Sequence, residues 1–105
     1  MDVYISGVGM TKFGRSEDSL EKMMAEAAIL ALNDAQLERV DAIHIGGMNV
    51  EEFEGDSNFA TLLMDTLGLA GTPTTRVEAA SSTGGGVFET AFYEVAAGHM
   101  KNILV

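Results

Sequence analysis

The sequence of 105 residues contains no cysteine, no tryptophan and one proline, and its 16 acidic residues far outnumber its 6 basic ones. Without cysteine, the chain can form no disulfide, no thiolate metal site and no cysteine nucleophile. The formal net charge of −10 repels nucleic-acid phosphates and anionic lipid headgroups. The composition therefore disfavours nucleic acid and membrane surfaces as partners.

Long apolar runs are absent as well. No stretch reaches the roughly 18 apolar residues that a membrane span requires, and residues 1–5 lack the basic region that begins a signal peptide. We therefore expect a cytoplasmic protein. Hydrophobic residues make up 47% of the chain and charged residues 21%, which is typical of globular proteins. The length suits one domain or part of one.

Strand and helix patterns alternate along the chain. Short apolar runs bounded by turn residues predict four strands, at residues 3–8, 40–48, 74–79 and 102–105. Apolar residues at three- and four-residue spacing predict helices between them, at residues 18–35, 59–67 and 82–97. Strands joined through helices lie parallel in one sheet. The pattern therefore predicts an α/β fold.

Three local features have simple structural interpretations. Asp18 and Glu21 have the spacing of a capping pair, which predicts that the first helix begins beside them. The acidic residues 51–56 offer carboxylates without the spacing of a calcium loop, so we expect a solvated or dimer-facing loop and no metal site. His44 lies within a predicted strand with no recognisable catalytic partner, so we expect it to be paired or at a sheet edge.

The most informative stretch is residues 76–86, where a predicted strand runs through a tight turn into a helix. Ser81 lies in the turn, where the N–H groups and the dipole of the helix stabilise negative charge. Residues 84–86 are all glycine, and each costs about 1 kcal/mol of helix propensity relative to alanine. Their presence suggests the close approach of another backbone or a substrate.

Two interpretations of this turn remain open on pattern alone. Ser81 has the position of a nucleophile at a strand-to-helix junction. Alternatively, the hydroxyl residues 81–83 only cap the helix, and the glycines allow tight packing. A phosphate-binding loop is disfavoured, because Val87 stands where that motif requires lysine.

Two segments resemble the thiolase family. Residues 76–85, Arg-Val-Glu-Ala-Ala-Ser-Ser-Thr-Gly-Gly, are similar to the thiolase nucleophile segment Val-Glu-x-Ala-Cys-Ala-Ser-Gly-Gly. Residues 7–15 are similar to the start of archaeal and sterol-carrier-type thiolases. The resemblance implies a three-layer α/β/α, βαβαβαβ half-domain with parallel strands and an incomplete sheet. It also implies that residues 1–105 are the N-terminal part of a thiolase-like domain that is truncated or completed by another chain.

The same resemblance implies a function. It indicates an acyltransferase of the acetyl-CoA C-acetyltransferase type, acting on acyl-CoA thioesters as substrates, with no covalently bound cofactor. Ser81 stands at the position of the nucleophilic cysteine, and Ser82, Gly84 and Gly85 match the small residues of the substrate-binding turn. The alternative is a non-catalytic thiolase-like assembly subunit or an inactive fragment.

The resemblance also bears on partners. In thiolases, the activating histidine, a second cysteine and most coenzyme A contacts follow the part of the family that this sequence resembles. The half-domain sheet of the family has strand order 3-2-4-5-1, with strand 5 antiparallel between strands 4 and 1. An absent strand 5 leaves two strand edges unpaired. We therefore expect a homo-oligomer or a second chain that supplies the C-terminal half.

Overall fold

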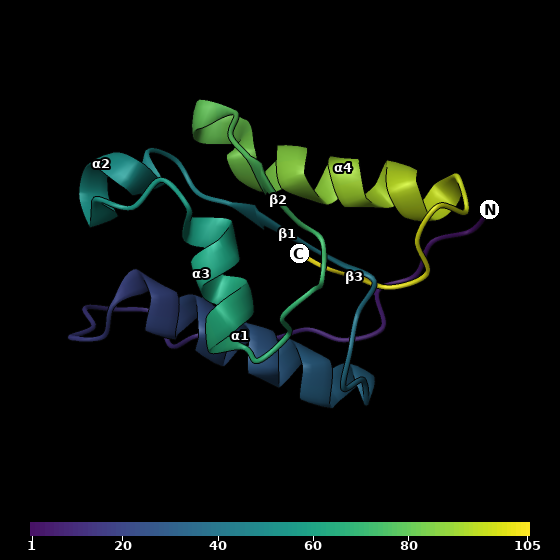
Figure 1. Ribbon diagram of the computed structural model, residues 1–105, viewed down its shortest axis with the longest axis horizontal. Helices are drawn as coiled ribbons and strands as arrows, with labels where there is room; N and C mark the ends of the chain where they lie inside the picture. The colour runs from purple at the N-terminus through teal and green to yellow at the C-terminus, as the bar shows by residue number, and fades with distance from the viewer.

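The computed structural model describes residues 1–105 and has three layers (Figure 1). The middle layer is a parallel sheet in the order β2-β1-β3, formed by β1 (Ala42–Gly46), β2 (Thr74–Val77) and β3 (Ile103–Leu104). Helices α1 (Leu20–Ala35) and α3 (Phe59–Thr66) lie on one face, and α4 (Thr83–Ala96) lies on the other. The predicted α/β/α architecture with an incomplete parallel sheet is confirmed.

The order of the three strands also agrees with the thiolase pattern. In chain order, the predicted second, third and fourth strands correspond to β1, β2 and β3, so the observed sheet contains the 3-2-4 part of the expected order. Ile43 lies opposite Thr74 of β2 and Leu104 of β3. The chain therefore forms the centre and one side of the expected half-domain sheet.

The strand predicted at residues 3–8 is absent, and this part of the prediction is wrong. The segment forms no backbone–backbone hydrogen bond; the N–H of Val8 instead donates to Asp34 Oδ2 at 2.9 Å. Gly7 and Gly9 lie directly against α1, where an added Cβ would come closer than 3.0 Å to α1 backbone atoms. A strand requires a neighbouring strand to pair with, and residues 3–8 have none.

The first helix begins beside Asp18 and Glu21 as predicted, but its capping residue and the predicted acidic loop require correction. The α1 helix is capped by Ser19, whose Oγ accepts a hydrogen bond from the Lys22 N–H at 3.2 Å, whereas Asp18 forms an ion pair with Lys22 at 2.9 Å. The acidic segment predicted as a loop contains the short helix α2 (Val50–Glu54). Five residues are too few to show helical periodicity in a sequence.

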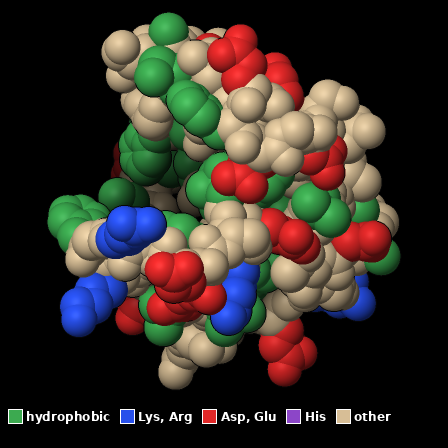
Figure 2. Space-filling view, turned by 90° about the vertical axis from the view of Figure 1, so that its left-hand side faces the viewer, with side chains coloured by type: hydrophobic (Ala, Val, Ile, Leu, Met, Phe, Trp, Pro, Cys, Tyr) green, Lys and Arg blue, Asp and Glu red, His purple; other side chains and the backbone are tan.

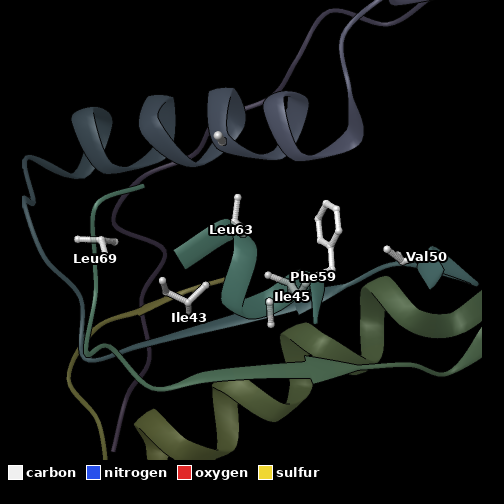
Figure 3. Packing of buried hydrophobic residues seen from close by; sticks show 8 residues of the cluster. Ile43, Ile45, Val50, Phe59, Leu63 and Leu69 are labelled. Carbon is white, nitrogen blue, oxygen red and sulfur yellow. The ribbon is translucent and has the colours of Figure 1, made fainter. Parts of the chain in front are cut away.

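The hydrophobic core lies between the sheet and the α1/α3 layer (Figure 3). Alternation along β1 directs Ile43 and Ile45 toward this layer, where they pack with Phe59 and Leu63 of α3. His44 faces the other layer and is only 1% exposed, with Nε2 3.3 Å from Glu94 Oε2 on α4. The expectation of a paired histidine is confirmed.

No helix is both long and apolar enough to cross a membrane.

Candidate functional site

The candidate site is the turn between β2 and α4. After β2, residues Ala80–Ser82 form a 3-10 turn that runs directly into α4 at Thr83. Ala80 has a left-handed backbone conformation with φ of 48°, which is uncommon for alanine. This sharp turn places Ser81 two residues before the first residue of α4. The strand-to-helix junction predicted from the sequence is therefore present.

The three hydroxyl groups of this turn have different surroundings. Thr83 is buried, and its Oγ1 donates to the Ala80 carbonyl at 2.7 Å and accepts from the Ala79 N–H at 2.8 Å. The Ser82 hydroxyl donates to the Ala79 carbonyl at 2.8 Å. The Ser81 hydroxyl is exposed and has no hydrogen-bond partner within the chain. The hydroxyl groups of Ser82 and Thr83 thus stabilise the turn, and the hydroxyl group of Ser81 remains available for other contacts.

The start of α4 is open. No side chain caps its first N–H groups, which together with the helix dipole favour an anion or developing negative charge. Gly84 and Gly85 lie in the first turn of the helix, and a Cβ at either position would meet no atom within 4 Å. The glycines therefore do not serve packing within this chain, and the space over them is free for another molecule or segment.

A network of charged groups surrounds the turn. The carboxylate of Glu78 accepts hydrogen bonds from the N–H groups of Ala80 at 2.7 Å and Asn49 at 3.1 Å. These two bonds, assisted by the positive charge of Arg76, hold the pKa of Glu78 below its ordinary value. Arg76 also forms an ion pair with Glu51 of α2, which lowers the pKa of that carboxyl group. Both carboxylates are therefore ionised at neutral pH.

A large groove extends from this turn along α4. We call it the N-terminal groove; it has a volume of about 890 Å³ and is lined by residues 1–9, the adjoining faces of α1 and α4, and residues 100–105. Gly84 contributes to one end of it, and Phe88 and Phe92 contribute to its wall. Figure 2 shows hydrophobic side chains around a hollow on one side of the molecule. The groove is apolar, and nothing in the chain fills it.

The arrangement is suited to hold a nucleophile but does not contain a base for it. A serine hydroxyl must lose its proton during attack, and this requires a hydrogen-bonded base. No histidine or carboxylate hydrogen-bonds to Ser81. His44 is buried against α4 and already engaged with Glu94. The turn therefore supplies position and helix electrostatics, without the proton acceptor.

Comparison with known proteins identifies relatives of this sequence. No model of a known protein family matches the chain. It is 38% identical over 101 residues to an acetyl-CoA acetyltransferase of Methanothermobacter thermautotrophicus, covering 93% of this chain and 26% of the relative. It is 36% identical over 107 residues to an acetyl-CoA acetyltransferase of Methanocaldococcus jannaschii, covering 99% of this chain and 27% of the relative. A benzoylsuccinyl-CoA thiolase subunit BbsB of Thauera aromatica is 39% identical over 101 residues, and the match covers 91% of this chain and 25% of the relative.

Solved structures support the fold. The 3-oxoacyl-[acyl-carrier-protein] synthase III of Aquifex aeolicus matches with a TM-score of 0.73 and 24% identity, covering 84% of this chain and 29% of that one. The synthase III of Pseudomonas aeruginosa matches with a TM-score of 0.64 and 26% identity, covering 76% of this chain and 24% of that one. The fold is therefore the thiolase fold.

Within that fold, the sequence is related to acetyl-CoA acetyltransferases, and the predicted resemblance to thiolases is confirmed. The chain spans about a quarter of the length of these curated relatives.

The sequence indicated some of the site but not all of it. Ser81, Ser82, Gly84 and Gly85 lie together at the start of α4, as expected, although their roles stay predictions. Sequence patterns gave no reason to connect Glu78 with Asn49, because the two residues are 29 positions apart. The glutamate stands in the segment that resembles thiolases, which is the only signal that could have singled it out.

Proposed function

We propose that this chain is the N-terminal part of a thiolase-like acyltransferase that acts on acyl-CoA thioesters, with Ser81 at the acyl-accepting position. The observation that carries the proposal is the exposed, unengaged Ser81 hydroxyl at the uncapped start of α4. It lies in the segment that resembles the thiolase nucleophile segment, within a chain related to acetyl-CoA acetyltransferases.

The proposed step is transfer of the acyl group from coenzyme A to Ser81. A bond forms between Ser81 Oγ and the carbonyl carbon, and the thioester C–S bond breaks. A base in the remainder of the protein takes the hydroxyl proton, which passes to the departing thiolate of coenzyme A. The open N–H groups and dipole of α4 stabilise negative charge that develops beside residue 81.

Intact-mass measurement after incubation with acetyl-CoA tests this proposal, with the chain alone and with any protein that co-purifies with it. In the full-length protein, or with a co-purifying protein that supplies the base, we expect one acetyl group on the native sequence and none on Ser81→Ala. The control Ser82→Ala, whose hydroxyl is bonded within the turn, should also carry one. Absence of an adduct on the native chain, together with no gain in the Ser81→Cys variant in its full-length context, would overturn it.

A second candidate is a thiolase-like subunit that has no acyl-transfer activity of its own. The observation that favours it is the serine in place of cysteine, together with the absence of a base bonded to Ser81. One relative is itself named as a thiolase subunit. The Ser81→Cys arm of the experiment separates the two candidates, because an intact acyl-transfer site gains reactivity from a thiol.

We further propose that the N-terminal groove receives a β-strand supplied by the remainder of the thiolase-like protein, on the same or a second chain. Residues 1–9 have no backbone–backbone hydrogen bonds, and β3 is an edge strand of the sheet. A strand would satisfy both sets of backbone groups, which an acyl chain or another apolar ligand would not. The chain covers only about a quarter of its relatives, so most of their length remains to supply it.

A further inference from the structure

Two residues with left-handed backbone conformations donate hydrogen bonds to one carboxylate. Three non-glycine residues of the chain have positive φ: Gln36, Asn49 and Ala80. Gln36 occupies the ordinary left-handed position that ends α1. The other two, Asn49 before α2 and Ala80 before Ser81, both donate their N–H groups to Glu78, one to each carboxylate oxygen.

The strain at Ala80 requires an external restraint. Asparagine adopts the left-handed region readily, whereas alanine does so rarely. Such a conformation persists only where surrounding contacts fix it, and these positions occur often at functional sites. Two side chains from outside the 3-10 turn hold this residue: Glu78 Oε2 accepts from the Ala80 N–H at 2.7 Å, and Thr83 Oγ1 donates to the Ala80 carbonyl at 2.7 Å.

We propose that Glu78 is a positioning residue for Ser81. Its carboxylate clamps the left-handed Ala80 and joins the turn to the segment before α2, so that the Ser81 hydroxyl is fixed against the start of α4. The functional part of this inference rests on the proposed acyl-accepting role of Ser81. The clamp itself rests only on the two hydrogen bonds and the two positive φ values.

The chemistry of a carboxylate suits this role. Its two oxygen atoms accept hydrogen bonds from the N–H groups of Asn49 and Ala80, which are 31 residues apart in sequence. A glutamine of the same shape has one acceptor oxygen, so it can replace only one of these two bonds. The charged groups near Glu78 are Arg76 on β2 and Glu51 on α2. Protonation of Glu78 removes acceptor capacity and charge together, which weakens both bonds.

Amide NMR on the isotope-labelled chain tests the clamp. As the pH is lowered from neutral, we expect the N–H signals of Ala80 and Asn49 to shift with one common midpoint, below the ordinary glutamate pKa. Glu78→Gln should abolish this common step at both positions and change the Ala80 coupling constant that reports φ. Glu54→Gln is the control, because it changes an exposed carboxylate of α2 that accepts neither of these bonds. It should leave both the common step and the Ala80 coupling constant unchanged. Separate midpoints, or a common step that survives in Glu78→Gln, would overturn the clamp.

Acyl-adduct kinetics then test positioning as distinct from stability. We expect Glu78→Gln to slow acetylation of Ser81 at least about tenfold, because small displacements of a reacting group have large effects on rate. The native rate should fall on acidification with the midpoint seen by NMR, and Glu78→Gln should lose that dependence. An unchanged rate in Glu78→Gln overturns the positioning role. A common NMR step, without any adduct on the native sequence or on Ser81→Cys in the full-length context, confirms the clamp and rejects the acyl-accepting role of Ser81.

Discussion

At residue 81 a hydroxyl stands at the position that we propose to correspond to the thiol of thiolases, and the two groups need different surroundings. A cysteine has a pKa near 8.5 and is readily converted to the thiolate beside a helix N-terminus. A serine hydroxyl stays protonated and depends on a base at the moment of attack. The observed turn offers helix electrostatics and a fixed position, so it meets the requirements of a thiol more fully than those of a hydroxyl.

The glycines of the first turn of α4 give a prediction at the same scale. Because an alanine Cβ at position 85 meets no atom within 4 Å, we expect Gly85→Ala to raise the free energy of unfolding by about 0.5–1 kcal/mol. Urea denaturation measures the change. If a substrate passes over this position, the same variant should also slow acetylation of Ser81.

A matched control is Gly71→Ala, which also meets no atom within 4 Å but has φ of +88°. An alanine is strained in that conformation, so this variant should lose stability. A loss of stability in Gly85→Ala would show that the first turn of α4 is not the unobstructed helix described above. Unchanged acetylation in Gly85→Ala would remove Gly85 from the substrate-binding residues.

At the scale of elements, the last strand depends on a single carboxylate. Asp41, just before β1, accepts hydrogen bonds from the N–H groups of Lys101 at 2.8 Å and Asn102 at 3.0 Å. The Asp41 N–H donates in turn to the Asn102 carbonyl at 2.8 Å. Since β3 has only two residues, these contacts contribute much of what holds it beside β1.

This contact predicts a pH dependence. Hydrogen bonds from Asn102 and Lys101 lower the pKa of Asp41 in the folded chain. A lowered folded pKa means that the stabilisation is present above the unfolded pKa and is lost as pH falls through the folded pKa. We expect the hydrogen-exchange protection factors of Lys101 and Asn102 to decrease over that interval, and Asp41→Asn to remove the pH dependence. Equal dependence in the native and Asp41→Asn chains would contradict this assignment.

The elements also show which features a sequence can reveal. Helices α1, α3 and α4 were predictable because each carries an apolar stripe at helical spacing, and Gly68 and Gly98 mark two of their ends with φ of +69° and +76°. The strand predicted at residues 3–8 failed because apolar alternation signals burial, whereas a strand also needs a paired neighbour. The Glu78 contact to Asn49 was unpredictable because it depends on how distant segments meet.

At the scale of the whole molecule, much apolar surface faces solvent. Several side chains around the N-terminal groove are exposed, among them Ile5 at 69% and Phe88 at 49%. An unpaired strand edge beside an apolar groove favours association with another chain. The net charge of −10 opposes association between copies of the chain. The balance between the two depends on salt, which screens the charge.

The groove gives a prediction about association. We expect the native chain to associate in sedimentation velocity experiments, and more strongly as salt concentration rises. Ile5→Glu, inside the groove, should shift the chain toward the monomer. Phe53→Glu is the matched control, because Phe53 is 75% exposed on α2 and outside the groove. A native chain that is monomeric and melts cooperatively, or an equal effect of both variants, would contradict the expectation that the groove drives association.

The contact of Gly7 and Gly9 with α1 limits how the sequence can vary. An added Cβ at either glycine would come closer than 3.0 Å to the backbone of residues 27–35. The Ala35 side chain also lies against Gly7, so a larger apolar residue at position 35, which in most cores fills space, would here separate the two segments. In a saturation-mutagenesis library, positions 7, 9 and 35 should therefore accept only the smallest residues. Larger residues should be tolerated on the exposed side of α1, at positions such as Glu26 and Asn33.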